Sequence, residues 1–453
     1  MKHLRRILFV VILLASANGA LALMMLGSTP LGIGACLLLL AGFVYVNLRP
    51  LPKTAPTKRI CQLSAGCELL RLFLITATIN AVWMLLWLPA AIRMAKGGGF
   101  FSGLLLVIWI INAIPMVILE AILFWNGMIR VYLTSVQLGL KHRILAALCG
   151  WIPFLNIWYL TKIIRITSDE VEFETEKWEL DEVRAENEVC KTKYPILLVH
   201  GVFFRDFRYL NYWGRIPKEL KRNGAVVYYG QQQSAASVED SGIELAARIR
   251  EILKETGCEK VNIIAHSKGG LDSRAAIAHA GCAPYVATLT TINTPHRGCI
   301  YAEYLLNKVP EAVRQKVAAA YNATLKRLGD ENPDFLAAVT DLTESACLAR
   351  NETTPDMPGV VYESVMSYCR KARHGKFPLN ATYPEVKHFD GKNDGLVSVD
   401  SAKWGTRFTL LEPVGKRGIS HGDVVDLNRE NIPGFDVREF YVNLVADLKK
   451  RGY

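Results

Sequence analysis

A serine stands at a strand-to-helix corner of this chain. The segment VNIIAHSKGGLDSR, residues 261–274, begins with a β-branched run and ends with small, helix-compatible residues, and Ser267 lies between the two parts. Such a corner forces the serine out of the sheet edge with strained backbone angles, and the small residues Ala265 and Gly269 let the strand and the helix approach closely. A serine held in this way can act as a nucleophile when a neighbouring base takes its proton.

An acid and a base follow this serine in the chain. We expect Asp394 to be the acid, because the run NDG after an apolar strand makes a tight turn that can hold a carboxylate fixed; Asp390 and Asp400 are its competitors. The base is His421, in the glycine-flanked run GISHGD, since it is the one histidine of nine that lies downstream of the acid. The order Ser267, Asp394, His421 is one of the known orders of a catalytic triad.

The chemistry of such a triad gives each group a role. His421 would take the serine proton during attack and later protonate the leaving group, while Asp394 would fix the imidazole tautomer and stabilise its cation. The tetrahedral intermediate also needs two N–H donors for its negative oxygen, each worth about 3–4 kcal/mol. We expect these donors to be the backbone N–H groups of Lys268 and Val202, with Phe203 as the alternative to Val202. The ammonium group of Lys268 is expected to be exposed.

A mostly parallel sheet must position these groups. From Tyr194 onward apolar strands alternate with amphipathic helices, which predicts an α/β domain with helices on both faces of the sheet. The predicted strands are 195–200, 225–229, 261–265 and 286–292, and the predicted helices are 238–256 and 270–280. Each strand–helix–strand unit needs about 30 residues, and this spacing provides them.

Residues 299–384 break this rhythm. They contain helical stretches at 302–308 and 310–328 and then a turn-rich run at 350–359. Their place after the strand that follows the corner predicts a helical cap that acts as a lid over the site. A purely structural helical insertion is the alternative.

The first 165 residues are predicted to be a membrane region with four or five spans. Most of their long apolar runs are near the ~20 residues that cross a bilayer. These runs are 7–26, 31–48, 69–92, 100–126 and 144–163. This half holds 15 Lys and Arg and only two acids, Glu68 and Glu120, whereas residues 166–453 hold 38 Lys and Arg against 40 acids. The net charge of +11 therefore belongs to the flanks of apolar segments, and we expect a bilayer and no nucleic acid as partner.

Basic residues in the short loops predict the orientation of this region. The N-terminus has three, residues 49–59 have four and residues 130–143 have three, whereas the loops between them have none and two. Positive-inside logic places the N-terminus in the cytoplasm. Four spans would leave the C-terminal half inside the cell, and five would leave it outside. We favour five spans in a multi-pass protein of the cell membrane, although the fifth segment, which contains Pro153 and Asn156, could instead lie in the interface.

Residues 166–190 are predicted to be an acidic linker. They hold ten acids and two basic residues with no apolar face of any length, which is typical of a solvated and partly helical segment. The predicted domains are therefore 1–165, 166–190 and 191–453. Ten cysteines without C-x-x-C spacing indicate neither a metal cluster nor a disulfide framework, although Cys347 and Cys369 could pair.

Together these motifs resemble the bacterial triacylglycerol lipases of the α/β-hydrolase superfamily. The matching runs are PILLVHG (195–201), AHSKGGLDSR (265–274), TINTPHRG (291–298), DGKNDGLVSVDSAKWG (390–405) and ISHGD (419–423). The resemblance covers about residues 190–453 and implies a carboxylester hydrolase acting on lipid acyl chains, with Ser267, Asp394 and His421 as its triad. The membrane half has no counterpart in those secreted lipases. A membrane-tethered enzyme would meet acyl esters of the phospholipid, glycerolipid or lipoprotein type.

The resemblance leaves the cofactor and the reaction class open. Some of these lipases carry a structural calcium near the histidine loop, with an acid two residues after the histidine. Asp423 stands there, but no clear second acid matches upstream, so calcium is unassigned and no cofactor is expected to be required. The alternatives are a thioesterase, acyltransferase or amidase on the same fold, or a non-enzymatic membrane protein with a hydrolase-like domain. The last would show a degraded triad, and this chain keeps all three residues.

Overall fold

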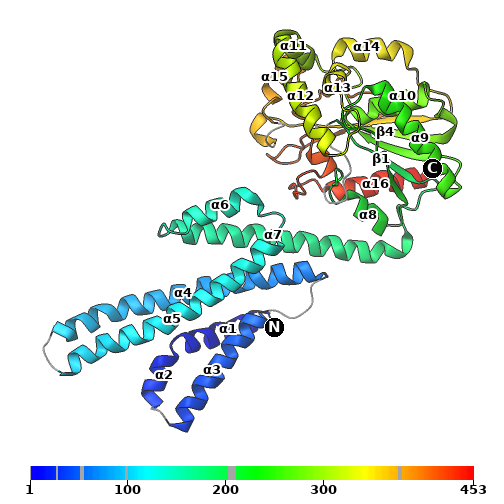
Figure 1. The fold of residues 1–453 in the computed structure, drawn as a ribbon. Coiled ribbons are helices and arrows are strands. Elements are labelled where there is room, and N and C mark those ends of the chain that lie inside the picture. The colour runs from blue at the N-terminus through cyan, green and yellow to red at the C-terminus, as the bar shows by residue number, and fades with distance from the viewer. Residues whose placement is uncertain (1, 27–28, 51–55, 97–99, 203–210, 376–379) are drawn as a thin grey trace. The chain divides into compact units, whose positions relative to one another are not determined.

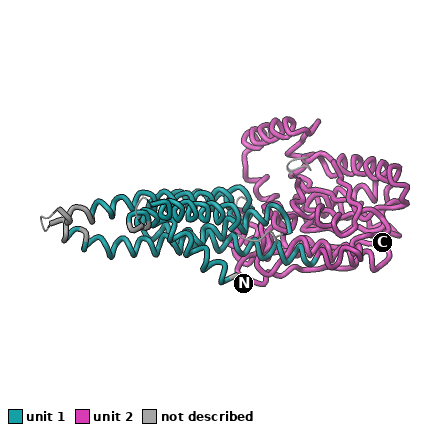
Figure 2. The backbone as a smooth tube through the Cα atoms, turned by 90° about the horizontal axis from the view of Figure 1, so that it is seen from below, with its two compact units in different colours: residues 1–180 teal, residues 181–453 magenta. Residues whose placement is uncertain are grey.

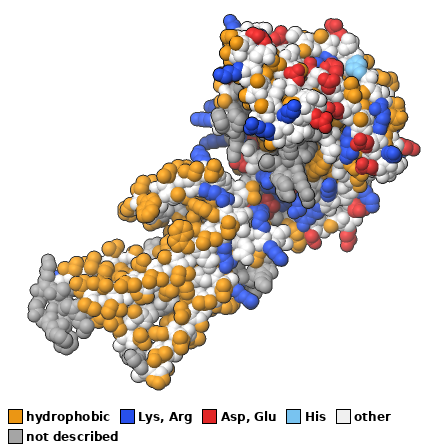
Figure 3. Space-filling model, viewed as in Figure 1, with side chains coloured by type: hydrophobic (Ala, Val, Ile, Leu, Met, Phe, Trp, Pro, Cys, Tyr) orange, Lys and Arg blue, Asp and Glu red, His pale blue; other side chains and the backbone are white. Residues whose placement is uncertain are grey.

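The chain divides into two compact units, residues 1–180 and residues 181–453 (Figure 2). The computed structural model describes residues 2–26, 29–50, 56–96, 100–202, 211–375 and 380–453. Each unit has hydrophobic clusters of its own. Hydrophobic side chains cover the visible face of the helices of the first unit, whereas charged side chains gather on the second (Figure 3).

The described part of the first unit is helical. Its helices are α1 (Lys2–Ala17), α2 (Gly19–Leu26), α3 (Pro30–Leu48), α4 (Lys58–Lys96), α5 (Phe100–Thr134), α6 (Gly139–Cys149) and α7 (Leu155–Arg184), the last of which runs into the second unit (Figure 1). Among the described residues, three helical stretches are long and apolar enough to cross a membrane by length and composition: Pro30–Leu48, Lys58–Ala90 and Leu106–Thr134.

Two of the five apolar runs are not single helices. The run 7–26 is divided at Asn18, between α1 and α2. The run 144–163 is divided by a turn that contains Pro153 and Phe154, and Phe154 has a φ of 63°. Proline removes a helix hydrogen bond and a positive φ cannot continue a right-handed helix, so α6 and α7 are separate helices. The number of membrane crossings therefore stays a prediction.

Polar side chains connect the apolar helices to one another. The amide of Asn18 donates to Asn80 over 3.0 Å and accepts from Asn112 over 2.8 Å. Glu120 accepts from Asn80 over 2.9 Å and from Thr76 over 3.0 Å. These contacts satisfy polar groups that would otherwise be costly among apolar helices, so Glu120 has a structural explanation.

The second unit is built on a six-stranded parallel sheet. The strands are β1 (Ile196–Val199), β2 (Val227–Tyr229), β3 (Val261–His266), β4 (Val286–Ile292), β5 (Val361–Ser367) and β6 (Arg407–Leu411). Their order in the sheet is β2-β1-β3-β4-β5-β6, and every neighbouring pair is parallel. In a parallel sheet the carboxyl ends of all strands meet at one edge, so the loops after β1, β3, β4 and β5 can share one site.

Helices cover both faces of this sheet, as predicted. The helices are α8 (Ile216–Arg222), α9 (Val238–Thr256), α10 (Lys268–Ala278), α11 (Ile300–Lys308), α12 (Glu311–Arg327), α13 (Phe335–Thr340), α14 (Glu344–Thr353), α15 (Tyr383–Asp390) and α16 (Val437–Lys450), with short 3-10 turns at Ala185–Asn187, Ala283–Tyr285, Ala372–His374 and Asp423–Val425. One core cluster joins α8 and α16 to the sheet, and another joins α9 and α10 to it (Figure 1). The sheet is therefore buried on both sides.

The segment assigned to a cap contains a strand that the sequence analysis missed. Residues 300–353 hold α11 to α14, but the chain then returns to the sheet as β5. Glu363 and Ser364 interrupt the apolar pattern of this strand, although both are buried, and the Glu363 carboxylate is paired with Arg451 at 2.8 and 2.9 Å. The helical insertion is thus shorter than the range 299–384. A helix, α15, and not an apolar strand, precedes the acidic turn near residue 394.

Candidate active site

Ser267 occupies the corner between β3 and α10 with a strained backbone. Its φ is 54° and its ψ is −131°, a region that non-glycine residues rarely adopt. Its backbone N–H donates to Ile292 over 2.9 Å, and its carbonyl accepts from the Thr294 hydroxyl over 2.8 Å. These bonds to the end of β4 hold the corner, and they keep the serine at the carboxyl edge of the sheet.

The small residues around the corner allow the close approach that the sequence predicts. A Cβ placed on Gly269 would lie 2.3 Å from the carbonyl oxygen of His200, at the end of β1. A Cβ on Gly201 would lie 2.8 Å from the Cβ of Ser267. The loop after β1 therefore lies directly against the serine.

His421 and Asp394 form a hydrogen-bonded pair next to this corner. The Nδ1 of His421 lies 2.7 Å from Oδ2 of Asp394, and both side chains are buried. The other oxygen, Oδ1, accepts from the backbone N–H groups of Leu396 and Val397 over 2.9 and 2.8 Å. The His421 ring packs on the ring of His266, the residue before the serine, with centroids 4.5 Å apart. Nδ1 is thus engaged by the acid, and Nε2 is the ring nitrogen left for a neighbour.

The competing acids lie elsewhere. Asp390 is the last residue of α15, and its carboxylate faces the backbone N–H groups of Ile300 and Tyr301, while burial raises its pKa. The side chain of Asp400 is 82% exposed and pairs with Lys403 at 2.6 Å. Of the three acids considered from the sequence, the structure brings Asp394 to His421.

An asparagine that the sequence analysis passed over orients the acid. The side-chain amide of Asn293 donates to Oδ2 of Asp394 over 2.5 Å and to the Ser367 hydroxyl over 2.7 Å. Asn293 has a φ of 48° and follows β4 directly. The signal in the sequence was a polar residue at the carboxyl end of a strand in the run TINTP, but β5 had to be recognised before its partner Ser367 could be placed.

His266 keeps a neutral ring beside His421. Its Nδ1 lies 2.6 Å from the Tyr212 hydroxyl. Burial, and after it the proximity of His421, holds the pKa of His266 well below its usual value. Its ring therefore adds no positive charge next to the base. His200 likewise bonds locally, with Nδ1 2.8 Å from the Gly201 carbonyl and Nε2 3.0 Å from that of Gln232.

The side chain of Lys268 is buried, so the expectation that it would be exposed was wrong. Its Nζ lies 2.6 Å from Oδ1 of Asp272 and 3.1 Å from the Ser241 hydroxyl, and the side chain is 2% exposed. Ser241 belongs to α9, so the lysine connects the start of α10 to the neighbouring helix. Sequence reasoning missed this because an i,i+4 Lys–Asp pair is more often a surface feature.

The two predicted oxyanion donors lie on either side of the corner. Lys268 is the first residue of α10, where backbone N–H groups have no partner within the helix. Val202 follows Gly201 in the loop against Ser267, and its side chain packs against a cluster of Ala235 with Leu325 and Ala338 of the helical insertion. The insertion therefore borders this loop. The alternative donor, Phe203, lies outside the described residues.

Comparison with known proteins agrees with this architecture. Residues 196–337 match the family model described as "Putative serine esterase (DUF676)". The second unit has the parallel sheet with helices on both faces that an α/β-hydrolase fold requires. A triacylglycerol lipase of Pseudarthrobacter phenanthrenivorans is 35% identical over 176 residues, which is 36% of this chain and 54% of that protein. Triacylglycerol lipase 2 of Saccharomyces cerevisiae is 27% identical over 54% of this chain and 75% of that protein.

The residues that match the family model lie within the second unit. This chain spans about half the length of the bacterial relatives it matches, 54% and 49% for the first two. A solved structure, the mature lipase BlEst2 of Bacillus licheniformis, is 23% identical and covers 56% of this chain and 92% of its own, with a TM-score of 0.42.

The loop that carries His421 does not fit a calcium ion. One carboxylate oxygen of Asp423 accepts from the backbone and hydroxyl of Ser420 over 2.9 and 2.6 Å. The other accepts from the Arg417 guanidinium over 2.9 Å. Calcium requires six to eight oxygen ligands and no competing cation. Among the described residues, no group of three or more His, Cys, Asp and Glu side chains could hold a metal ion.

Proposed function

We propose that this protein is a membrane-anchored serine carboxylester hydrolase, similar to lipases, that hydrolyses acyl esters of lipids through Ser267, His421 and Asp394. The observation that carries the proposal is the pairing of His421 with Asp394 beside a serine held at a strained corner. The match to a serine esterase model and to proteins named triacylglycerol lipases supports it.

The first half-reaction would form an acyl-enzyme. The Ser267 hydroxyl attacks the ester carbonyl carbon as Nε2 of His421 takes its proton, and the carbonyl electron pair moves to oxygen. The backbone N–H groups of Val202 and Lys268 donate to that oxyanion. When the tetrahedral intermediate collapses, the C–O bond to the alcohol breaks, and the imidazolium returns the proton to the departing alkoxide.

The second half-reaction would release the acid. Water attacks the acyl-enzyme carbonyl while His421 takes one of its protons, and collapse of the second intermediate returns that proton to Ser267. Asp394 keeps its position throughout, because four donors, including the His421 N–H, surround its two oxygens. Its role is to hold the imidazole in one tautomer and orientation.

The lipid character of the substrate follows from the first unit. Its apolar helices would keep the hydrolase unit beside a bilayer, where acyl esters of phospholipids and glycerolipids are concentrated. The relatives named triacylglycerol lipases support an acyl-ester substrate. A phospholipid, glycerolipid or lipoprotein-type ester is therefore the proposed substrate class.

A substrate panel separates this proposal from its alternatives. The full-length protein, in detergent and in vesicles, is assayed on p-nitrophenyl esters of short and long acids, acyl thioesters, acyl anilides and dispersed glycerolipids, beside Ser267→Ala. The proposal predicts turnover of long-chain and glycerolipid esters that Ser267→Ala loses. Exclusive turnover of thioesters or anilides would replace it with a thioesterase or amidase. Absence of turnover throughout would favour the non-enzymatic alternative.

A further inference from the structure

Three helices of the first unit, α4, α5 and α7, meet at one end of the long helices. Arg59, near the start of α4, donates to the Thr134 carbonyl at the end of α5 over 2.9 Å and to Glu170 of α7 over 2.6 Å. The Ser135 hydroxyl donates to Glu170 over 2.6 Å. The beginning of α4, the end of α5 and the middle of α7 therefore lie at the same level.

The beginning of the chain lies at this end as well. Arg6 is paired with Glu68 of α4 at 2.6 Å, and Arg5 donates to the Arg49 carbonyl after α3 over 2.8 Å. Arg130 of α5 donates to the carbonyl of Asn47 over 3.1 Å. Basic residues thus collect at the end shared by α1, α3, α4, α5 and α7.

Helices α6 and α7 form a hairpin. The ring of His142 on α6 bonds the hydroxyl of Tyr159 on α7 over 2.7 Å, across the turn that contains Pro153. An arm of 11 residues, the length of α6, is about 16 Å long, whereas the hydrocarbon core is about 30 Å thick. The hairpin therefore turns back before it could cross.

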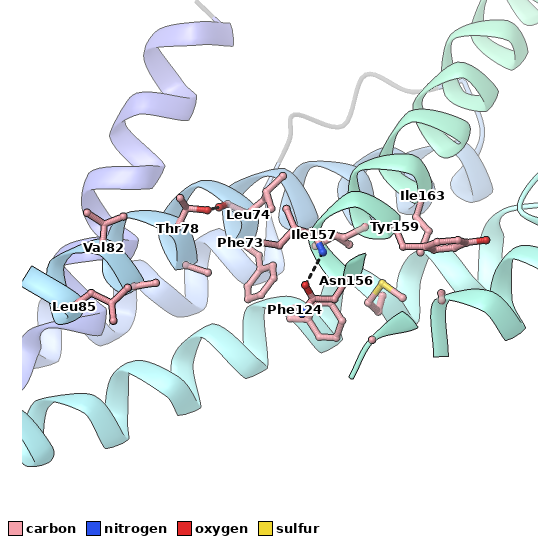
Figure 4. A pocket seen from close by; sticks show the side chains of 16 residues that line it. Phe73, Leu74, Thr78, Val82, Leu85, Phe124, Asn156, Ile157, Tyr159 and Ile163 are labelled. Atoms are coloured by element: carbon pink, nitrogen blue, oxygen red, sulfur yellow. Dashed lines mark hydrogen bonds between the residues drawn. The ribbon is translucent and has the colours of Figure 1, made fainter. Parts of the chain in front are cut away.

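The hairpin covers only part of α4 and α5. Leu160 and Ile163 of α7 pack in one core cluster with Leu63 and Leu70 of α4 and Val131 of α5. Between the hairpin and these helices lies an apolar pocket of about 410 Å³, whose lining also includes Leu160 and Ile163 (Figure 4). The lining of this pocket includes Ala77, Ala81, Val82 and Leu85 of α4 together with Gly150 and Ile157 at the tip. A crossing helix would continue over these residues of α4 and fill that space.

The tip of the hairpin carries the side chains that favour a membrane interface. Trp151 is 89% exposed and Phe154 is 85% exposed, and Trp158 is more than half exposed. The Lys162 ammonium lies over the rings of Trp158 and Tyr159 at 5.4 and 5.7 Å. Exposed aromatic rings flanked by lysine are typical of segments that enter the headgroup region and upper acyl chains of one leaflet.

We propose that α6 and α7 form a re-entrant hairpin, which enters one leaflet with its tip and leaves on the side it came from. The hydrolase unit then lies on the side of the membrane that holds the start of α1. Beyond Arg165, α7 is rich in acids and cannot cross a bilayer. By the positive-inside rule this side is the cytoplasm. The hairpin corresponds to the interfacial alternative for the fifth segment, so we revise the preference for five spans.

Protease accessibility tests the sidedness in the full-length protein. A site for a sequence-specific protease is placed before Lys2, in the connection between α4 and α5, or after Tyr453, and sealed vesicles of both orientations are treated. The proposal predicts that the first and third sites are cut from one side and the second from the other. Cutting of the third site together with the second would overturn it.

Tryptophan quenching tests the insertion of the tip, whatever the enzyme hydrolyses. Full-length protein in vesicles of lipids with brominated acyl chains is compared as wild type, Trp151→Phe and Trp178→Phe. Trp178 is a matched control, because it lies on α7 within the acidic part of the helix. The quenched fraction of the fluorescence should fall in Trp151→Phe and not in Trp178→Phe. Equal effects of the two substitutions would contradict insertion of the tip.

Discussion

At the scale of single residues, the site depends on a carboxylate that is fully engaged. Asp394 accepts from His421 and Asn293 on one oxygen and from two backbone N–H groups on the other. Such a carboxylate can hold one imidazole tautomer with little freedom to turn. The proposed mechanism therefore depends on residue 394 being a carboxylate.

Replacing this acid with its amide tests that point. Asp394→Asn should lower kcat for ester hydrolysis by about 10⁴-fold, because the wrong imidazole tautomer would face the serine. Asp400→Asn is the matched control, since the Asp400 side chain is exposed and pairs with the exposed Lys403, and it should leave kcat unchanged. A large loss in Asp400→Asn with activity kept in Asp394→Asn would assign the acid differently.

The buried Lys268–Asp272 pair gives a prediction about stability. Lys268→Met leaves an unpaired buried carboxyl and should lower the free energy of unfolding by about 3–5 kcal/mol, while Lys268→Met/Asp272→Leu recovers most of it. Burial raises the pKa of Asp272 to about 7, so its protonated form is favoured in the fold and stability falls as pH rises through that value. The decrease in the free energy of unfolding caused by Lys268→Met is therefore larger at pH 8 than at pH 5.

Unfolding in detergent, followed by circular dichroism at both pH values, measures this effect. Lys254→Met, at an exposed position of α9, is the control and should change little. A loss in Lys268→Met no greater than in this control would mean that the buried pair does not stabilise the corner.

The sequence singled out Ser267, Asp394 and His421, whose catalytic roles stay predictions, whereas the residues that contact them could not be predicted. Ser267, Asp394 and His421 stand in short motifs whose order in the chain carries information. Asn293 reaches Asp394 only because β4 and β5 are neighbours in the sheet. The burial of Lys268 likewise depends on α9 packing against α10, a tertiary contact with no local signature.

At the scale of elements, the corner works because β1, β3 and α10 pack closely at one point. Gly269→Ala would bring a Cβ to 2.3 Å from a backbone carbonyl, which cannot move as a side chain does. This substitution should lower the free energy of unfolding by about 1–3 kcal/mol and reduce activity. Gly415→Ala is the control, because a Cβ there meets nothing within 4 Å. Thermal unfolding midpoints compare the two, and equal midpoints would refute the close packing.

The histidine loop gives a second prediction at this scale. Arg417 donates to Asp423 and to the carbonyls of His374 and Gly418, so it holds the loop that carries His421. Arg417→Ala should lower kcat by about tenfold to a hundredfold with little change in KM, because small displacements of a catalytic base are costly. Lys416 is the exposed neighbour of Arg417, and Lys416→Ala should leave kcat unchanged.

Chelation provides the complementary measurement for this loop. Since Arg417 and Ser420 already occupy both oxygens of Asp423, EDTA should leave the activity of the wild-type protein unchanged. Inactivation by EDTA that calcium reverses would show that a metal ion, and not the arginine, holds the loop.

Regular elements were predictable where their patterns are strong. The helix 238–256 was found at its observed bounds, because Ser237 caps its start and Gly257, with a φ of 69°, ends it. β5 was missed because Glu363 and Ser364 interrupt its apolar run, a pattern typical of an exposed segment, although both residues are buried. The division of the fifth apolar run into α6 and α7 was missed, since composition alone does not show the turn at Pro153.

At the scale of the whole molecule, the chain joins an apolar helical unit to a hydrolase unit with nearly balanced charge. The basic excess lies in the first 165 residues, as the sequence indicated, and Arg5, Arg6 and Arg59 lie at one end of the long helices. If the hydrolase unit leaves the membrane at that end, its substrates are esters of the cytoplasmic leaflet. Membrane attachment would then determine which lipids the enzyme meets.

The central claim is that Ser267 is an activated nucleophile in a membrane-bound protein. Labelling with a fluorophosphonate probe tests it directly, in membranes from cells that express the full-length chain or Ser267→Ala. We predict one labelled protein that stays with the washed membranes and disappears in Ser267→Ala, although both chains give the same circular dichroism after purification. Equal labelling of Ser267→Ala, or no labelling of the folded wild type, would contradict the account.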